Sequence, residues 1–91
     1  MTFVLFHIAT GAQIQSYRSE SSARKGLRSA NRNAGWTSRI SRSWTNGIEM
    51  EWCFNGSKYD HAPYGITEQE RWETKFSPSA QAQKYIEEYY E

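Results

Sequence analysis

The sequence is poor in the features that mark secreted and membrane proteins. It contains one cysteine, Cys53, only two prolines among 91 residues, and no long apolar run. A lone cysteine excludes an intramolecular disulfide and is typical of a reducing compartment. The mean hydropathy of −0.87 argues against a membrane-spanning helix. The apolar start of the chain lacks the basic segment of a signal peptide. We therefore expect a cytoplasmic protein that does not enter a membrane.

Residue types that build metal sites and active sites are also scarce. The chain has two histidines and one cysteine, and no pair of them has the spacing of a metal site. A thiol on an amphipathic strand, as at Cys53, is more often a packing residue than a nucleophile. No glycine-rich phosphate loop is present in the sequence. We therefore expect no catalytic residue, no metal and no cofactor.

Aromatic and aliphatic residues are frequent enough to build one small core. Hydrophobic residues make up 37% and aromatic residues 15% of the sequence, which argues against disorder. A chain of this length buries only about 60% of its unfolded surface and cannot support two independent cores. We expect one domain over residues 1–91.

The net charge of +1 conceals an asymmetry between the two halves of the chain. Residues 1–45 carry seven cations and one acid, whereas residues 46–91 carry four cations and nine acids. This distribution predicts either a basic surface for an acidic partner or two halves that neutralise each other within the fold.

Residues 3–17 are predicted to form a β-hairpin, because apolar residues alternate on both sides of a turn that contains Gly11. A three-residue loop that ends at Gly11 sets Phe6 opposite Ile14. The other face is also apolar near the open end of the hairpin, at Leu5, so a second cover is expected there.

A second hairpin is predicted around residues 45–47, where a three-residue loop sets Trp44 opposite Ile48. On this register one face is expected to point into the core, and it consists of Trp36, Ile40, Trp44, Ile48, Met50, Trp52 and Phe54. The positions expected to point outward are Ser41, Ser43, Glu49 and Glu51. Arg42 is left as the exception on the apolar face.

A helix is predicted between the two hairpins, from an N-cap at Ser19 to a stop at Gly35. Its narrow apolar stripe consists of Ala23, Leu27, Ala30 and Ala34. Gly26 lies beside this stripe and indicates that another part of the chain approaches the helix closely.

The C-terminal third is predicted to be a loop over residues 57–65 followed by two helices. A capping box from Thr67 to Glu70 opens the first helix, and Pro78 begins the second. An apolar seam on the last helix is expected to cover the second face of the first hairpin, through Ala82, Tyr85, Ile86 and Tyr89. The predicted fold class is α+β, with an antiparallel sheet of two hairpins, a connecting helix (ββαββ) and two C-terminal helices.

The predicted helix carries a basic face, opposite its apolar stripe, made of Arg24, Lys25, Arg28 and Arg32. Only Glu20 offers a carboxylate one turn away, to Arg24. We therefore expect these four residues, assisted by Arg18 and Arg39, to bind nucleic-acid phosphates. A solvated surface and an internal partner are the alternatives for this face. Candidates for exposed rings that stack on single strands are Tyr59, Tyr64 and Tyr90.

The acidic, tyrosine-rich end of the chain supports an alternative function. Its residues Tyr85, Glu87, Glu88, Tyr89 and Tyr90 are candidates for contact with another protein, such as a host enzyme whose activity the chain modulates. A further arrangement pairs these carboxylates with the basic helix of the same molecule, which would leave less positive charge for nucleic acid.

Several features of the first hairpin and helix occur together in one group of proteins. They are the turn at Thr10-Gly11, the segment Tyr17-Arg18-Ser19-Glu20, and the positions Ala23-Arg24, Leu27 and Asn31-Arg32. On these features residues 6–35, about a third of the chain, resemble small uncharacterised proteins of tailed bacteriophages, particularly marine ones. The resemblance implies a phage-encoded protein that acts in the bacterial cytoplasm, and it implies no catalytic residue.

Overall fold

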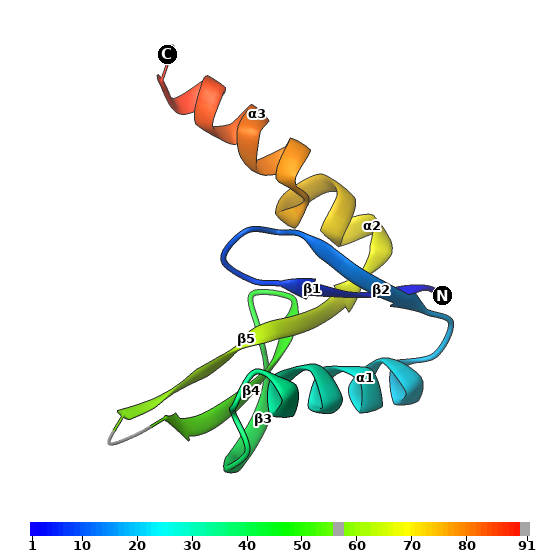
Figure 1. Ribbon diagram of the computed structural model, residues 1–91. Coiled ribbons are helices and arrows are strands. Elements are labelled where there is room, and N and C mark those ends of the chain that lie inside the picture. Colours follow the sequence, from blue (N-terminus) through cyan, green and yellow to red (C-terminus); the bar gives the residue numbers. More distant parts are fainter. Residues whose placement is uncertain (56–57, 90–91) are drawn as a thin grey trace.

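The computed structural model describes residues 1–55 and 58–89, which form one antiparallel sheet flanked by helices (Figure 1). The five strands lie in the order β2-β1-β5-β4-β3. Their bounds are β1 Phe3–His7, β2 Gln13–Tyr17, β3 Arg39–Thr45, β4 Ile48–Asn55 and β5 Lys58–Glu68. Helix α1 spans Glu20–Asn33. The C-terminal helical segments are α2 (Gln69–Arg71), the π-helical turn η1 (Trp72–Phe76) and α3 (Pro78–Tyr89).

This architecture confirms the α+β class but corrects the predicted order of elements. The order is ββαβββ, because a fifth strand occupies the centre of the sheet. The helical segments after it form one bent helix instead of two. The bend lies at Ser77, whose hydroxyl donates to Glu73 O at 3.0 Å and accepts from Ala80 N at 3.1 Å.

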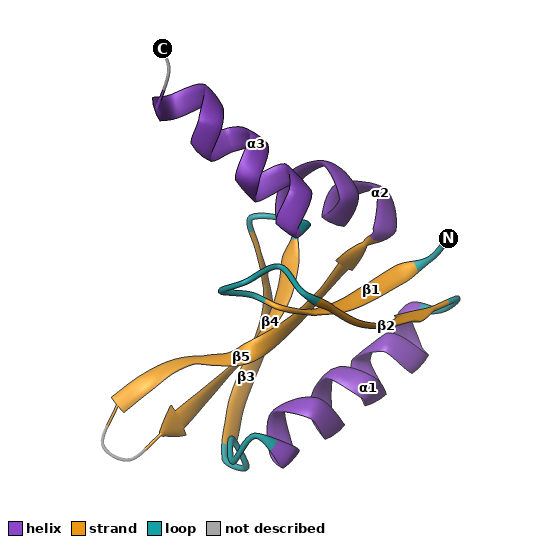
Figure 2. Cartoon of the chain, turned by 45° about the horizontal axis from the view of Figure 1, so that its top comes forward, coloured by secondary structure: helices purple, strands orange, loops and turns teal. Residues whose placement is uncertain are grey.

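Both faces of the sheet are covered, and two core clusters result. Helix α1 lies against one face, and the first part of the C-terminal helix lies against the other (Figure 2). The cluster under α1 consists of Phe3, Leu5, Ala23, Leu27 and Ile66. The opposite cluster consists of Val4, Phe6, Ile48 and Met50, with Trp72 and Phe76 packed against it. Because β1 supplies residues to both clusters, its first four residues, 3–6, are all apolar.

Helix α1 begins and ends where the sequence predicts. Ser19 Oγ accepts from Ser22 N at 3.1 Å, and Gly35 follows the last turn with φ of 95°. Gly26 is also a point of close approach, because a Cβ added there would collide with the phenol of Tyr17. The face of the first hairpin that carries Leu5 is covered by α1, whereas the prediction assigned this face to the last helix.

Helix α3 extends away from the sheet instead of covering it (Figure 1). It buries none of its described residues. The predicted seam is therefore exposed, with 65% of Tyr85 and 68% of Tyr89 accessible to solvent. None of the described helices is both long and apolar enough to span a bilayer.

The register of the first hairpin follows the predicted three-residue loop only at its open end. Phe3 pairs with Tyr17 and Leu5 with Gln15, but a bulge follows and Phe6 pairs with Gln13. The predicted pairing of Phe6 with Ile14 is therefore wrong, and Ile14 is exposed.

The register of the second hairpin differs from the prediction by one residue. Thr45 pairs with Ile48, which leaves a two-residue turn at Asn46-Gly47 with φ of 54° and 79°. Positive φ at both positions is the geometry of a type I′ turn. A shift of one residue moves every side chain of the strand to the other face of the sheet.

This shift places the β3 side chains on the face opposite to the predicted one, and α1 covers the face of β4 that was expected to be exposed. Trp44 and Ile40 are 47% and 57% exposed instead of packed in the core. Glu49 and Glu51, expected outside, face α1 and are each 1% exposed. Arg42 shares the face of these glutamates instead of an apolar face, which removes the exception in the predicted pattern.

The segment 57–65, predicted as a loop, lies mostly in the central strand β5. Pro63 is tolerated there because the β4–β5 register shifts between Met50 and Trp52, so the strand bulges around the proline. Its carbonyl still accepts from Ile8 N at 2.9 Å. Thr67 belongs to the same strand and donates to Gly47 O at 2.7 Å, so it does not cap a helix. Part of the predicted Asn55-Gly56 turn lies outside the described residues.

Candidate functional site

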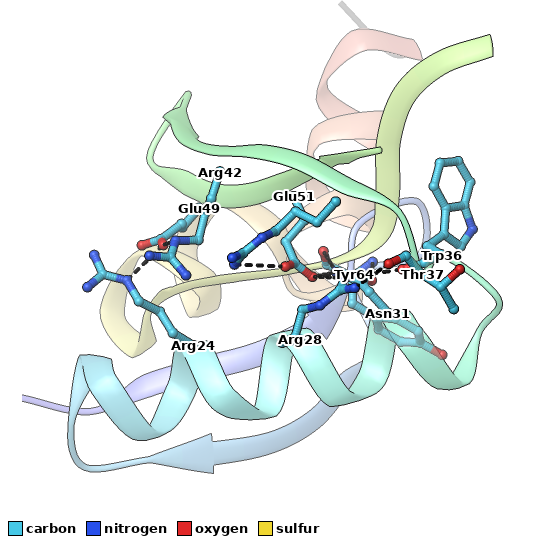
Figure 3. Close-up of polar contacts among 10 residues, drawn as sticks. Arg24, Arg28, Asn31, Trp36, Thr37, Arg42, Glu49, Glu51 and Tyr64 are labelled. Carbon is cyan, nitrogen blue, oxygen red and sulfur yellow. Dashed lines mark hydrogen bonds and ion pairs between the residues drawn. The ribbon is translucent and has the colours of Figure 1, made fainter. Parts of the chain in front are cut away.

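Two buried carboxylates on β4 organise the charged residues between α1 and β3 (Figure 3). Arg24 Nε lies 2.8 Å and Arg42 Nε lies 2.6 Å from Glu49 Oε1. Arg28 Nη1 lies 3.6 Å from Glu51 Oε1, and Arg39 Nη1 lies 3.5 Å from Glu51 Oε2. We call these four arginines the arginine cluster.

The spacing of helix and strand explains why the cluster forms a ladder. Four residues of α-helix, as from Arg24 to Arg28, advance by about 6 Å. Two residues of strand, as from Glu49 to Glu51, advance by about 6.8 Å. The two repeats nearly match, so successive turns of α1 meet successive side chains on one face of β4.

Helix α1 is held against the sheet by a further buried residue at the end of this ladder. Asn31 Nδ2 donates to Glu51 Oε1 at 2.8 Å, and Asn31 Oδ1 accepts from Tyr64 N at 3.0 Å. Arg28 in turn donates to Trp36 O at 3.2 Å and Thr37 O at 2.7 Å. Arg28 is therefore the cluster member most engaged in holding the chain that leads from α1 to β3.

The cluster retains more positive than negative charge. Its four guanidinium groups share Glu49 and Glu51, and Glu20 adds one further carboxylate through its contact with Arg24. The hydrogen bond with Glu49 raises the pKa of Arg24, against the opposing effect of desolvation, so this guanidinium stays charged. Glu49 Oε2 is buried and accepts no hydrogen bond from the described residues. The arginine side chains remain between 26% and 40% exposed, so the excess charge is accessible.

The remaining predicted cations lie outside the cluster. Arg18, Lys25 and Arg32 are exposed, and no described carboxylate forms an ion pair with them. Lys25 lines an open groove of ≈ 560 Å³ between α1 and the edge strand β2. Arg32 follows Arg28 by one turn of α1, beyond the reach of Glu51.

The structure brings only part of the predicted site together and adds residues to it. Arg24, Arg28 and Arg39 of the predicted set share the two glutamates, whereas the predicted outward position of those glutamates is wrong. The residues that sequence reasoning missed are Asn31, Arg42, Glu49 and Glu51. The signal that could have placed Arg42 beside the glutamates is Asn46-Gly47, because this dipeptide favours a two-residue turn and therefore the observed register. Asn31, Glu49 and Glu51 join the site through the packing of α1 on the sheet, which no local signal indicates.

The tyrosines and glutamates of the alternative site lie apart from the basic helix. Within the described chain, Glu87 and Glu88 form no ion pair with α1, and α3 projects from the opposite side of the sheet (Figures 1 and 2). The partners of the basic helix are the glutamates of β4 instead. Tyr85 and Tyr89 stack on each other with ring centroids 5.7 Å apart. Tyr90 lies outside the described residues.

Cys53 does not have the environment of a nucleophile. It is fully buried on the α1 face of β4. Burial, together with the negative charge of Glu51, raises the pKa of its thiol. His61 lies on the other side of the sheet, against the ring of Trp52. Among the residues that the structure describes, no three potential ligands come close enough to hold a metal ion.

Comparison of the chain with protein-family models, with curated proteins and with solved structures finds no match.

Proposed function

We propose that this chain is a non-enzymatic protein that binds the nucleic-acid backbone along α1 and β3. The observation that carries the proposal is the positive excess of the arginine cluster, which remains after Glu49 and Glu51 are counted. A guanidinium has more donors than these ion pairs use. Arg39 and Arg42 each show one contact to a carboxylate, so further donors are available for phosphate oxygens.

The buried carboxylates support this function by orienting the arginines. A free arginine side chain loses rotational freedom when it binds a phosphate, and this loss weakens binding. Glu49 fixes Arg24 and Arg42 before any ligand arrives, and Glu51 does the same for Arg39. These side chains are therefore already ordered in the folded protein, and they lose less conformational entropy when a phosphate binds.

The exposed cations extend the surface on both sides of the cluster. Arg32 lengthens the row of Arg24 and Arg28 along the helix, and Lys25 and Arg18 widen it toward β2. Contacts of this kind are electrostatic and independent of base sequence. We therefore expect binding to DNA and RNA with a steep dependence on salt.

The test substitutes cations that form no ion pair with a described carboxylate, so that the fold is not disturbed. Binding to labelled oligonucleotides is measured by fluorescence anisotropy at about 50 and 200 mM salt. The double variant Lys25→Gln with Arg32→Gln is expected to bind about tenfold more weakly at low salt, with a salt slope reduced by about two. Lys75→Gln with Lys84→Gln removes the same charge from the C-terminal helix and serves as the control. Equal affinities of the two double variants, or no binding at low salt, would refute the proposal.

A second candidate function rests on α3. Its exposed tyrosine pair and the neighbouring Glu87 and Glu88 form a surface suited to a basic patch on another protein, including a host enzyme. Under this hypothesis a defined protein is retained from a nuclease-treated lysate, and Tyr85→Ala with Glu88→Lys abolishes its retention. Retention that survives this double variant would exclude α3 as the contact surface.

A further inference from the structure

Four ring side chains gather on one face of β4 and β5, where β4 ends and β5 begins. This end of the two strands lies away from α3 (Figure 2). Trp52 pairs with His61 and Phe54 pairs with Tyr59 across the two strands. The rings of Trp52 and Tyr59 stack with centroids 5.8 Å apart and an interplanar angle of 22°. Phe54 meets Tyr59, and His61 meets Trp52, edge to face at 5.7 and 5.8 Å. We call these four residues the aromatic patch.

The rings of the aromatic patch pack against one another and are partly exposed. Phe54 and Tyr59 are each 51% accessible to solvent. Trp52 Nε1 donates to Ser43 Oγ at 2.8 Å, and the Tyr59 hydroxyl lies 3.1 Å from Ser41 Oγ. These polar ring atoms are therefore engaged within the sheet. The surface left for a ligand is ring carbon, which favours stacking over hydrogen bonding.

The C-terminal helix leaves this end of the sheet uncovered. Its Trp72 and Phe76 pack on the core cluster of this face, as does Trp52, so Phe54 and Tyr59 are the rings that stay exposed. Exposed rings in a domain of 91 residues forgo burial that would stabilise the fold. A binding role accounts for rings that are held in place and still open to solvent.

The face that carries the aromatic patch presents no described carboxylate that would repel an anionic ligand. The described β3, β4 and β5 positions that share its face at this end of the sheet include Ser41, Ser43, Met50, Trp52, Phe54, Tyr59 and His61. Arg39, Lys58 and Asp60 lie at the same end of the sheet but on its opposite face, where Arg39 and Asp60 are the neighbours of Cys53. Arg39 also belongs to the arginine cluster, so one ligand strand can pass from the patch across the edge strand β3 to the cluster.

We propose that the aromatic patch stacks unpaired bases, so that the preferred ligand is single-stranded nucleic acid. This inference rests on the proposed function and adds the ligand class to it. Stacking on protein rings is tolerant of base identity, because every base has a flat face. A duplex hides those faces within its own stack and can use only the cationic surface.

The experiment separates stacking from phosphate binding. Three labelled ligands of equal length are compared by anisotropy: a single strand with bases, an abasic single strand and a duplex. Wild type is expected to bind the strand with bases about tenfold more tightly than the abasic strand. Phe54→Ala with Tyr59→Ala is expected to remove that difference and to leave abasic affinity unchanged. Tyr85→Ala, which removes an exposed ring from α3, is the control and is expected to change neither affinity.

A second variant guards against a loss of fold. Phe54→Leu with Tyr59→Leu keeps apolar side chains on the sheet but removes the flat rings, and circular dichroism checks that it folds. It is expected to behave like the alanine pair. Equal affinity of wild type for the strand with bases and the abasic strand would overturn the inference. So would a preference for bases that survives both double variants, or a protein ligand that competes at the patch while the single strand does not bind there.

Failure of this inference differs from failure of the proposed function. If only the inference fails, all three ligands bind through their phosphates, and Lys25→Gln with Arg32→Gln weakens each of them. If the proposed function fails, the abasic strand and the duplex do not bind at low salt. Base-dependent binding in the absence of any abasic binding would support the patch and refute the cationic surface.

Discussion

Asn31 donates from its side-chain amide to Glu51 Oε1 at 2.8 Å, and both side chains are buried. The same asparagine accepts from Tyr64 N, so it connects α1 with two strands of the sheet. Together with the arginine cluster, this contact shows that the basic first half and the acidic second half of the chain partly neutralise each other. They do so at the glutamates of β4, and within the described residues Glu87 and Glu88 take no part.

Substitution of Asn31 should therefore destabilise the protein far more than substitution of an asparagine on the exposed face of α1. Asn31→Ala leaves Tyr64 N–H without its acceptor and removes a donor from the buried Glu51. The expected loss in the free energy of unfolding is about 2–3 kcal/mol. Asn33→Ala changes an exposed asparagine of the same helix and should cost less than about 0.5 kcal/mol. Urea unfolding followed by circular dichroism measures both, and similar losses would contradict the buried role of Asn31.

Neutralising Glu49 should lower the stability of the protein and strengthen its binding to nucleic acid. Glu49→Gln removes the carboxylate between Arg24 and Arg42, and the expected loss of stability is about 1–2 kcal/mol because both arginines are partly solvated. The same substitution raises the positive charge of the proposed contact surface. Nucleic acid should then bind several-fold more tightly at about 50 mM salt, and this gain should shrink at higher salt.

The control for that experiment is Glu70→Gln, which makes the same change in net charge on the exposed side of the C-terminal helix. It should leave stability nearly unchanged and affect binding less than Glu49→Gln does. An equal gain in affinity from the two substitutions would mean that overall charge, and not the arginine cluster, controls binding.

Gly26→Ala tests the close approach between α1 and β2. Alanine favours a helix over glycine by about 1 kcal/mol, so helix propensity alone predicts a more stable protein. The collision of the new methyl group with the phenol of Tyr17 predicts the opposite, a net loss of stability. In a Tyr17→Leu background the phenol is absent, and Gly26→Ala should then stabilise. A double-mutant cycle measured by urea unfolding gives the coupling, and additive effects would show that Tyr17 does not limit residue 26.

The parts of the fold that could be predicted depend on local signals. Ser19 and Gly35 mark the ends of α1 because caps act within one turn of the helix. The strand β5 could not be predicted in this way, since Pro63 breaks the local strand pattern and is tolerated only through a bulge that forms against β4. Its identity as a strand depends on pairing with β1 and β4, which lie far away in the sequence.

The candidate site was only partly predictable for a related reason. The basic face of α1 follows from helical periodicity, which places Arg24 and Arg28 one turn apart. Their partners depend on the register of the second hairpin, where apolar alternation favoured one arrangement and the Asn46-Gly47 dipeptide another. The turn geometry placed Arg42 on the face of the glutamates. Glu49 is buried because α1 covers that face, and this contact between distant segments has no local signal in the sequence.

Cys53 provides a probe of the α1 face of the sheet in solution. Burial, reinforced by the charge of Glu51, raises the pKa of its thiol in the folded protein. Below the ordinary pKa of a thiol both the folded and the unfolded chain keep the proton, so stability does not depend on this group. As the pH rises above that value the unfolded chain loses the proton first, and the free energy of unfolding falls until the folded thiol also titrates. Urea unfolding of wild type should therefore show a steeper decline above about pH 8.5 than Cys53→Ala shows, since that variant lacks the group.

Alkylation of Cys53 in the native protein by iodoacetamide should be slow and should accelerate only with unfolding. Rapid alkylation at neutral pH in the absence of urea would show that the thiol is accessible and that α1 does not stay closed over β4.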